Sequence, residues 1–174
     1  MKDTLGRQRK ALRPVLIVLL VLATIGCDQA TKTIARARLA DKGTVFVVDT
    51  VLVLRYVENE GAFLSLGVGL PRPLRTLAFI AFPLVALGIM TAYILRARNR
   101  EWMTLAAFSF IVGGGMGNLI DRLFRDGRVS DFINLGIGQL RTGIFNVADL
   151  SILAGCILLV LSPGIFRGHP AAQV

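Results

Sequence analysis

Long apolar runs, separated by short polar or basic segments, dominate the hydrophobic pattern of this sequence. An α-helix needs about 20 mostly apolar residues to cross the hydrocarbon core of a bilayer. Runs close to this length predict membrane spans at approximately residues 14–34, 76–95, 102–121 and 144–166. The first run is long enough only if its helix continues through Asp28 to Lys32, which would place these two residues at i and i+4, where they can pair. The pattern therefore predicts an all-α membrane protein with four transmembrane helices, in one membrane-embedded domain over residues 1–174.

Residues 44–66 break the helical pattern. β-branched residues are frequent from Thr44 to Val57, and Asp49 and Arg55 interrupt the apolar sequence. This composition predicts one or two strands in a small extramembrane β-region.

Basic residues give the chain a formal net charge of +9, while 54% of its residues are hydrophobic. The charges are spread between the apolar runs and form no stripe, so we expect anionic membrane lipids and no nucleic acid as partners. The basic N-terminus and the loop Arg96–Arg100 favour cytoplasmic termini by the positive-inside rule, although the segment 33–75 also carries arginines. In this orientation, the polar residues near the non-cytoplasmic ends of the spans gather near the outer face of the cytoplasmic membrane.

The N-terminus has a second interpretation. A basic segment, a short apolar run and Gly26-Cys27 also fit a secretory signal peptide with a lipid-modified cysteine. Three further membrane-length runs argue against a secreted lipoprotein. Cys27 and Cys156 suggest neither a disulfide framework nor a zinc site. We expect both cysteines to be buried as small hydrophobic residues. Cys and His residues form no cluster in the sequence, and we expect no metal and no cofactor.

Two aspartates flank the start of the last apolar run, Asp131 before it and Asp149 at its opening. Ionisable groups within membrane segments are rare and usually functional. Two close carboxylates cannot both ionise easily, so a pair can hold one acid and one base at neutral pH, as peptide hydrolysis requires. The alternative is that Asp149 caps the last helix and that Asp131 is an ordinary loop residue. The only histidine, His169, lies in the tail, which argues against a serine–histidine triad.

Two asparagines lie close to these aspartates or to a span end. Asn146 could orient Asp149, three positions further along one helix face, or could cap the helix. Asn118 follows Gly113 and Gly117, a pair of small residues that lets membrane helices approach closely. Asn118 could therefore form a hydrogen bond between two helices.

The remaining polar candidates also have a structural and a functional interpretation. Arg122 could pair with Asp121 or Asp126, extend to lipid headgroups, or steady the site. Asn59 and Gly61 could place a loop over the site or simply form a turn.

Five blocks of sequence resemble the lipoprotein signal peptidases (signal peptidase II), in the order and near the spacing of that family. They are Asp28-Gln29-Ala30-Thr31-Lys32, Asn59-Glu60-Gly61-Ala62, Gly113-Gly114-Gly115-Met116-Gly117-Asn118-Leu119-Ile120-Asp121-Arg122, Val129-Ser130-Asp131-Phe132-Ile133 and Phe145-Asn146-Val147-Ala148-Asp149. The resemblance implies an intramembrane aspartyl endopeptidase of the bacterial cytoplasmic (inner) membrane, with four transmembrane helices and a small extracytoplasmic β-region. Such enzymes remove the signal peptide from diacylglyceryl-modified prolipoproteins by cleaving before the lipidated cysteine.

The resemblance also implies roles for individual residues. Asp131 and Asp149 match the catalytic pair. Six residues match active-site support or substrate binding: Asn59, Gly61, Asn118, Arg122, Asn146 and Ala148. Three match structural polar residues: Asp28, Lys32 and Asp121. The implied partners are prolipoproteins, membrane lipids and globomycin-type inhibitors, and we expect a monomer. Phe63 departs from the family motif, which has a small residue there, and we expect altered packing beside the site.

Two other classes of function compete with a protease. In a small proton-coupled transporter, a membrane carboxylate such as Asp28 would bind proton and substrate in turn. The carboxylates gather at one face and the halves of the chain show no repeat, which argues against it. A structural membrane subunit gives no reason for two aspartates beside the last span. Release of a signal peptide would favour the protease, and substrate-dependent proton flux would favour the transporter.

Overall fold

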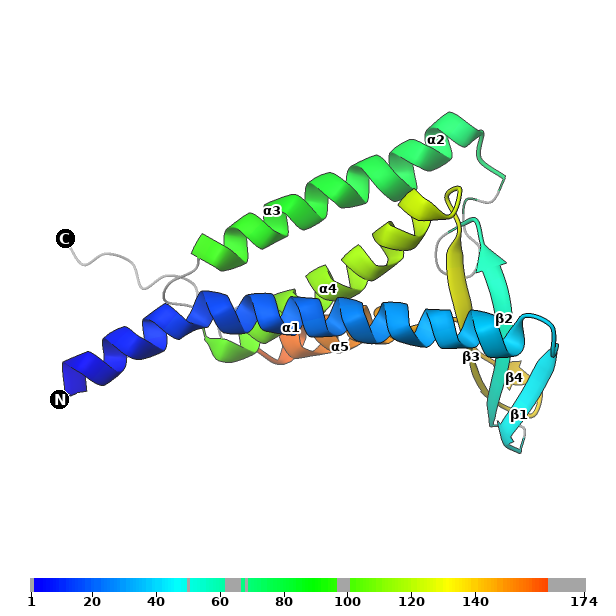
Figure 1. Ribbon diagram of the computed structural model, residues 1–174, viewed down its shortest axis with the longest axis horizontal. Coiled ribbons are helices and arrows are strands. Elements are labelled where there is room, and N and C mark those ends of the chain that lie inside the picture. The colour runs from blue at the N-terminus through cyan, green and yellow to red at the C-terminus, as the bar shows by residue number, and fades with distance from the viewer. Residues whose placement is uncertain (1, 50, 62–66, 68, 97–100, 163–174) are drawn as a thin grey trace.

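A bundle of helices with a small sheet at one end forms the structure, a computed structural model that describes residues 2–49, 51–61, 67, 69–96 and 101–162, with side chains from Leu12 onward. The elements follow in the order α1 (Lys2–Leu39), β1 (Thr44–Val48), β2 (Leu52–Asn59), α2 (Arg72–Thr76), a π-helical segment (Leu77–Ala81), α3 (Phe82–Arg96), α4 (Trp102–Phe124), β3 (Val129–Ile137), β4 (Leu140–Arg141) and α5 (Val147–Leu161). Figure 1 shows the sheet standing across the ends of the helices, with α1 beginning at the opposite end of the molecule.

In the described part of the chain, three helical segments are long and apolar enough to cross a membrane: Leu12–Leu39, Arg72–Arg96 and Trp102–Phe124. They contain the first three predicted spans, and α1 does continue through Lys32. The fourth, α5, has 15 residues, and a helix of this length extends about 22 Å against a hydrocarbon core of about 30 Å. The helix is therefore shorter than the span predicted over residues 144–166. The last residues of the predicted span lie outside the described part of the chain.

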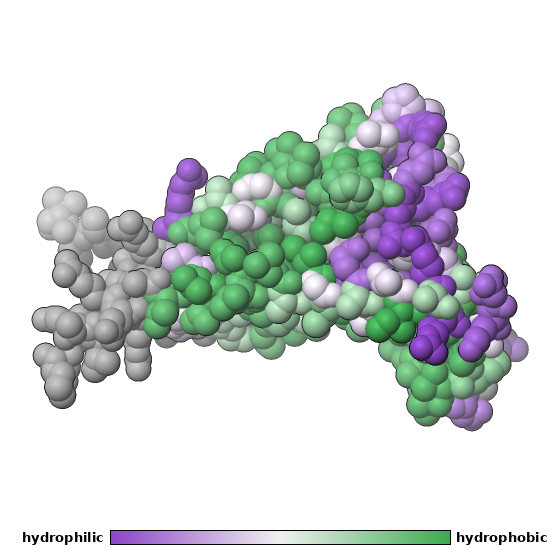
Figure 2. Space-filling view, viewed as in Figure 1, coloured by the Kyte–Doolittle hydropathy of each residue, from purple (hydrophilic) through white to green (hydrophobic). Residues whose placement is uncertain are grey.

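Helix α4 is the centre of the bundle. In an apolar 18-residue stretch of α4, 56% of the residues are buried. The corresponding fraction is 17% in Leu12–Leu39 of α1 and 11% in Arg72–Arg96. The outer helices expose large aliphatic side chains such as Leu19, Leu22 and Ile89, and Figure 2 shows hydrophobic residues covering the helices. These exposed faces are suited to lipid contact, because a soluble surface rarely carries apolar patches of this extent.

Glycines of α4 allow this central position, as the Gly113–Gly117 pattern predicts. A Cβ atom on Gly113 would lie 2.7 Å from Cβ of Thr24 in α1, and one on Gly117 would lie 2.5 Å from Oδ2 of Asp28. A Cβ atom on Gly114 would collide with the Ala148 carbonyl of α5. The close approach of helices to α4 is therefore confirmed, and larger residues at these positions would separate them.

The sheet is antiparallel, with strand order β1-β2-β3-β4. Strands β1 and β2 confirm the β-region predicted from residue 44, although residues 62–66 lie outside the described part. Strand β3 was not predicted, and the alternative that Asp131 is a loop residue is wrong, because Asp131 pairs with Val57. The reason is that residues Val129 to Phe132 are all buried, so they lack the alternation of apolar and polar residues that identifies a strand with one wet face.

The prediction that both cysteines are buried is wrong. Cys27 of α1 and Cys156 of α5 are exposed free thiols, although their apolar surroundings predicted burial. Both lie on outward faces of apolar helices, where a membrane, rather than protein, would cover them.

Candidate active site

Asp131 and Asp149 come from different elements at the end of the bundle that carries the sheet. Asp131 belongs to β3 and is only 4% exposed. Its Oδ1 accepts a hydrogen bond from Asn146 Nδ2 at 2.6 Å, and its Oδ2 accepts one from Asn59 Nδ2 at 3.1 Å. The carboxylate is therefore held on both oxygens by amide donors from β2 and from the start of α5.

Asp149 lies in the first turn of α5, where it forms a capping box with Asn146. Asn146 Oδ1 accepts from the Asp149 backbone N–H at 3.0 Å, and Asp149 Oδ2 accepts from the Asn146 backbone N–H at 3.1 Å. Asn118 Nδ2 of α4 donates to Asp149 Oδ1 at 2.9 Å. The predicted capping roles of Asn146 and Asp149 are confirmed, and the same contacts fix the orientation of the carboxylate.

Burial raises the pKa of Asp131 from 3.8 to about 6, and the charge of Asp149 adds to this effect. The hydrogen bonds from Asn59 and Asn146 and the positive charge of Lys32 oppose it by favouring the ionised carboxylate. The net result is a carboxyl group that exchanges its proton close to neutral pH.

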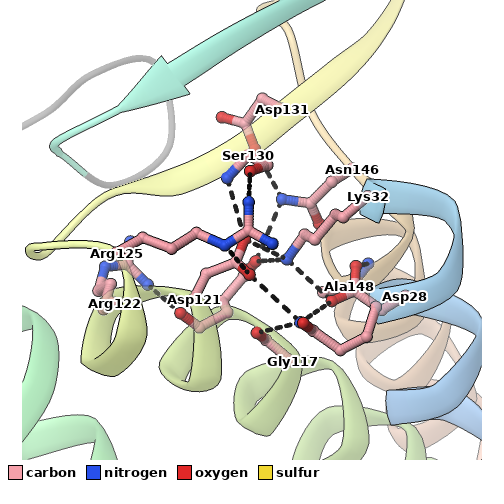
Figure 3. Close-up of polar contacts among 12 residues, drawn as sticks. Asp28, Lys32, Gly117, Asp121, Arg122, Arg125, Ser130, Asp131, Asn146 and Ala148 are labelled. Carbon is pink, nitrogen blue, oxygen red and sulfur yellow. Dashed lines mark hydrogen bonds and ion pairs between the residues drawn. The ribbon is translucent and has the colours of Figure 1, made fainter. Parts of the chain in front are cut away.

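A buried charge cluster of Asp28, Lys32 and Asp121 lies beside Ala148 at the start of α5 (Figure 3). Lys32 is fully buried, and its Nζ lies 2.8 Å from Asp28 Oδ2 and 3.2 Å from Asp121 Oδ2. The predicted pair of Asp28 and Lys32 is confirmed, with Asp121 as a second anion. Asp28 Oδ1 also accepts from the Ala148 backbone N–H at 2.9 Å, so the cluster anchors the first turn of α5 to α1.

Arg122 has other partners than the two aspartates predicted to pair with it. Its Nη2 donates to the Gly61 carbonyl at 2.9 Å, and its guanidinium lies 5.6 Å from the centre of the Phe79 ring. Asp121, its neighbour in sequence, points toward α1, because consecutive residues on a helix face directions about 100° apart. Asp126 pairs with Arg72 instead. Arg122 thus holds the turn after Asn59 against α4.

A small cavity lies between the two aspartates. It is lined by Asn59, Asn118, Arg122, Val129, Asp131, Ile144 and Asp149. Its volume of about 30 Å³ exceeds the roughly 10–15 Å³ that one water molecule needs. Arg122 also borders a second cavity of about 220 Å³, which includes apolar Phe79, Ile80 and Leu123. The arrangement offers room for a water between two carboxylates and a larger mixed surface beside it.

The structure brings together nearly all residues singled out from the sequence, by direct hydrogen bonds or in the cavity lining. Phe63 lies outside the described residues. Sequence reasoning missed Arg125, whose Nε lies 3.3 Å from Asp121 Oδ1 and whose Nη1 donates to Ser130 Oγ. Its i, i+4 spacing from Asp121 was the available signal. Among the described residues, no group of three or more His, Cys, Asp or Glu side chains could hold a metal ion.

Comparison with known proteins places this chain in a family. A sequence profile described as Signal peptidase (SPase) II matches residues 20–164. A lipoprotein signal peptidase of Syntrophus aciditrophicus is 32% identical over 148 residues, which cover 83% of this chain and 91% of that protein. One of Bifidobacterium adolescentis is 36% identical over 166 residues, which cover 92% and 81%.

Solved structures agree with the sequence comparison. Two structures of bacterial membrane enzymes, determined in meso at 2.3 and 1.9 Å resolution, superpose with a TM-score of 0.69 each. They are 28% and 26% identical in sequence, and each covers 84% of this chain, with 85% and 90% of their own chains covered. The aspartates, the asparagines that hold them and the buried lysine cluster lie within the matched region, and the chain belongs to the signal peptidase II family.

Proposed function

We propose that the protein is an aspartic endopeptidase that removes the signal peptide from diacylglyceryl-modified prolipoproteins, cleaving before the lipidated cysteine. Membership of the signal peptidase II family makes it a membrane protease that removes signal peptides from prolipoproteins. The mechanism and the cleavage position are the further steps of the proposal. The observation that carries the mechanism is the shared hydrogen-bond network of Asp131 and Asp149 beside a cavity with room for one water. The cleavage position follows from the family resemblance.

In the proposed reaction, water in this cavity attacks the carbonyl carbon of the residue before the lipidated cysteine. One carboxylate of the pair takes a proton from the water, and the protonated carboxyl of the other donates a proton to the leaving nitrogen as the C–N bond breaks. The products are the carboxylate of the signal peptide and the free amino group of the cysteine. The pKa of about 6 for Asp131 supports a pair that shares one proton near neutral pH.

The roles of the surrounding residues follow from their contacts. Asn59, Asn118 and Asn146 would hold the carboxylates, and Arg122 would hold Gly61 and the adjoining turn beside the substrate. Ala148 would position Asp149 through its bond to Asp28. The apolar wall of the second cavity suits a hydrophobic signal peptide or an acyl chain, and globomycin-type inhibitors would compete for this surface.

The proposal also includes a topology. Helix α5 would lie in the fourth span of a single domain over residues 1–174, and the protein would act as a monomer among membrane lipids. The termini would lie in the cytoplasm and the sheet at the periplasmic face of the inner membrane. Exposed Leu153, Ile157 and Val160 support lipid contact along α5, and the polar residues gathered where the helices meet the sheet support an interfacial site (Figure 2).

A gel-shift assay tests the function directly. Purified protein in lipid or detergent receives a diacylglyceryl-modified prolipoprotein, and we expect conversion to the mature form by the wild type alone, with no conversion by Asp131→Asn or Asp149→Asn. Asp41→Asn is the matched control, because this aspartate is exposed in the turn after α1 and lines neither cavity. Turnover by either folded aspartate variant would refute the catalytic pair. A wild type without turnover but with substrate-dependent proton flux would favour a transporter.

A further inference from the structure

Lys32 uses all three of its hydrogen-bond donors inside the protein. Besides Asp28 and Asp121, its Nζ contacts Asn118 Oδ1 at 2.9 Å, and its side chain is fully buried. A lysine ammonium only donates hydrogen bonds and never accepts one. Asn118 must therefore present its carbonyl oxygen to Lys32, which directs its amide nitrogen toward Asp149.

The same constraint passes to the second asparagine. Asn118 Oδ1 also accepts from Asn146 Nδ2 at 3.1 Å, and this nitrogen donates its other hydrogen to Asp131 Oδ1. Asn146 Oδ1 accepts from the Asp149 backbone N–H. Reversal of either amide would place oxygen against a carboxylate, or nitrogen against the ammonium of Lys32. The two amides therefore have one compatible orientation, and Lys32 determines it.

We propose that Lys32 is a positioning residue of the aspartate pair, which acts through Asn118 and Asn146 to keep an amide donor on each carboxylate without touching the substrate. This inference rests on the proposed function, because it assigns a role within that reaction. A purely structural lysine would be needed only for folding. A positioning lysine also changes the reaction rate and its pH dependence.

Charge gives Lys32 a second effect on the pair. It is a cation close enough to favour the ionised form of Asp131, so its loss makes protons harder to remove from the pair. The charged groups that face the pair or its supporting cluster are Asp28 and Lys32 from α1, Asp121, Arg122 and Arg125 from α4, and Asp149 from α5. Glu58 near the end of β2 and Glu60 just after this strand both pair with Arg128. Lys32 also bonds to the side chain of Asn118, which holds Asp149.

Lys32→Gln and Arg125→Gln form a matched pair of variants. Each removes a cation that pairs with Asp121, but only Lys32 contacts Asn118. The glutamine amide can either donate or accept, so Lys32→Gln removes both the charge and the directional constraint. Lys32→Arg keeps a cation that only donates hydrogen bonds and serves as the conservative variant.

The experiment measures kcat, KM and the pH profile of prolipoprotein cleavage for folded samples, with thermal unfolding of each variant recorded in parallel. We expect Lys32→Gln to lower kcat about 10- to 100-fold with little change in KM, and to move the profile to higher pH. Arg125→Gln should keep kcat within about threefold, since it leaves the amides in place, and should keep the profile. Lys32→Arg should recover part of kcat and return the profile toward the wild type.

Two outcomes would overturn the inference. One is a folded Lys32→Gln with wild-type kcat and pH profile, and the other is equal loss in Lys32→Gln and Arg125→Gln. If Lys32→Gln does not fold, the kcat and profile of Lys32→Arg decide, because a donor-only cation should keep part of kcat and a profile close to that of the wild type, and a folded Lys32→Arg without activity would overturn the inference. If the wild type itself shows no cleavage, the proposed function fails separately. The side-chain amide NMR signals of Asn118 and Asn146 then test the inference, since they should shift in Lys32→Gln and not in Arg125→Gln.

Discussion

Replacing Gly117 by alanine tests the tightest contact between α4 and the buried charge cluster. The added Cβ would lie 2.5 Å from Asp28 Oδ2 and 3.1 Å from its Cγ, whereas ordinary contacts begin at 3.4 Å. Asp28 cannot move freely, because it is fully buried and bonded to Lys32 at 2.8 Å and to the Ala148 N–H at 2.9 Å. A shift of the carboxylate large enough to relieve the collision would lengthen at least one of these bonds.

The magnitude follows from opposing effects. Overpacking costs about 1–3 kcal/mol, and complete disruption of a buried ion pair costs about 3–5 kcal/mol. Alanine recovers up to about 1 kcal/mol from its higher helix propensity. We expect Gly117→Ala to lower the free energy of unfolding by about 2–3 kcal/mol, and to reduce activity because Asp28 anchors the turn that holds Asp149.

Denaturant or thermal unfolding of the purified protein in detergent measures this effect. Gly26→Ala is the matched control, since it makes the same chemical change in α1, where a Cβ atom would meet nothing within 4 Å. The control should be as stable as the wild type or up to about 1 kcal/mol more stable. A Gly117→Ala protein that unfolds at or above the wild-type midpoint would refute the reasoning from close helix contact.

Two further predictions concern pH and topology. The pKa of Asp131 is about 6 in the folded protein, above its ordinary value of 3.8. The protonated carboxyl therefore contributes its full stabilisation below about pH 4. As the pH rises through 6, this contribution to the free energy of unfolding is lost, by about 3 kcal/mol. Unfolding of wild type and Asp131→Asn from pH 4 to 7 should show the wild type losing stability relative to the variant, and a constant difference would contradict the raised pKa. A nitroxide on Cys156, in a Cys27→Ser background, should be relaxed by oxygen more than by a water-soluble nickel complex, because α5 should face lipid there. Preferential relaxation by nickel would contradict a fourth span.

Periodicity within one helix made part of the site predictable from the sequence. Asp28 and Lys32 are four positions apart, so their contact followed as soon as α1 was extended through them. The capping box of Asn146 and Asp149 is local in the same sense, with partners three positions apart. In both cases the chain geometry over a single turn determines which side chains meet.

Long-range contacts were less accessible. Lys32 and Asn118 are 86 positions apart, and no spacing rule connects them. Strand β3 was missed because both of its faces are covered around Asp131, which removes the alternating pattern. The ion pairs predicted for Arg122 were wrong. Asp121 pairs with Lys32 and Asp126 pairs with Arg72 instead, and these contacts depend on the packing of the folded chain.

The wide sequence separation of the site has a consequence for biosynthesis. Asp28 meets the Ala148 N–H, 120 positions later in the chain, and at ~5–20 residues per second the ribosome needs about 6–24 s to add that length. During this interval α1 exists without its later partners. Asp28 and Lys32 lie one turn apart and pair with each other, so the nascent helix already holds a counter-ion for each of these charges. Under the proposed mechanism, the growing chain therefore remains an inactive protease until its last helix is made.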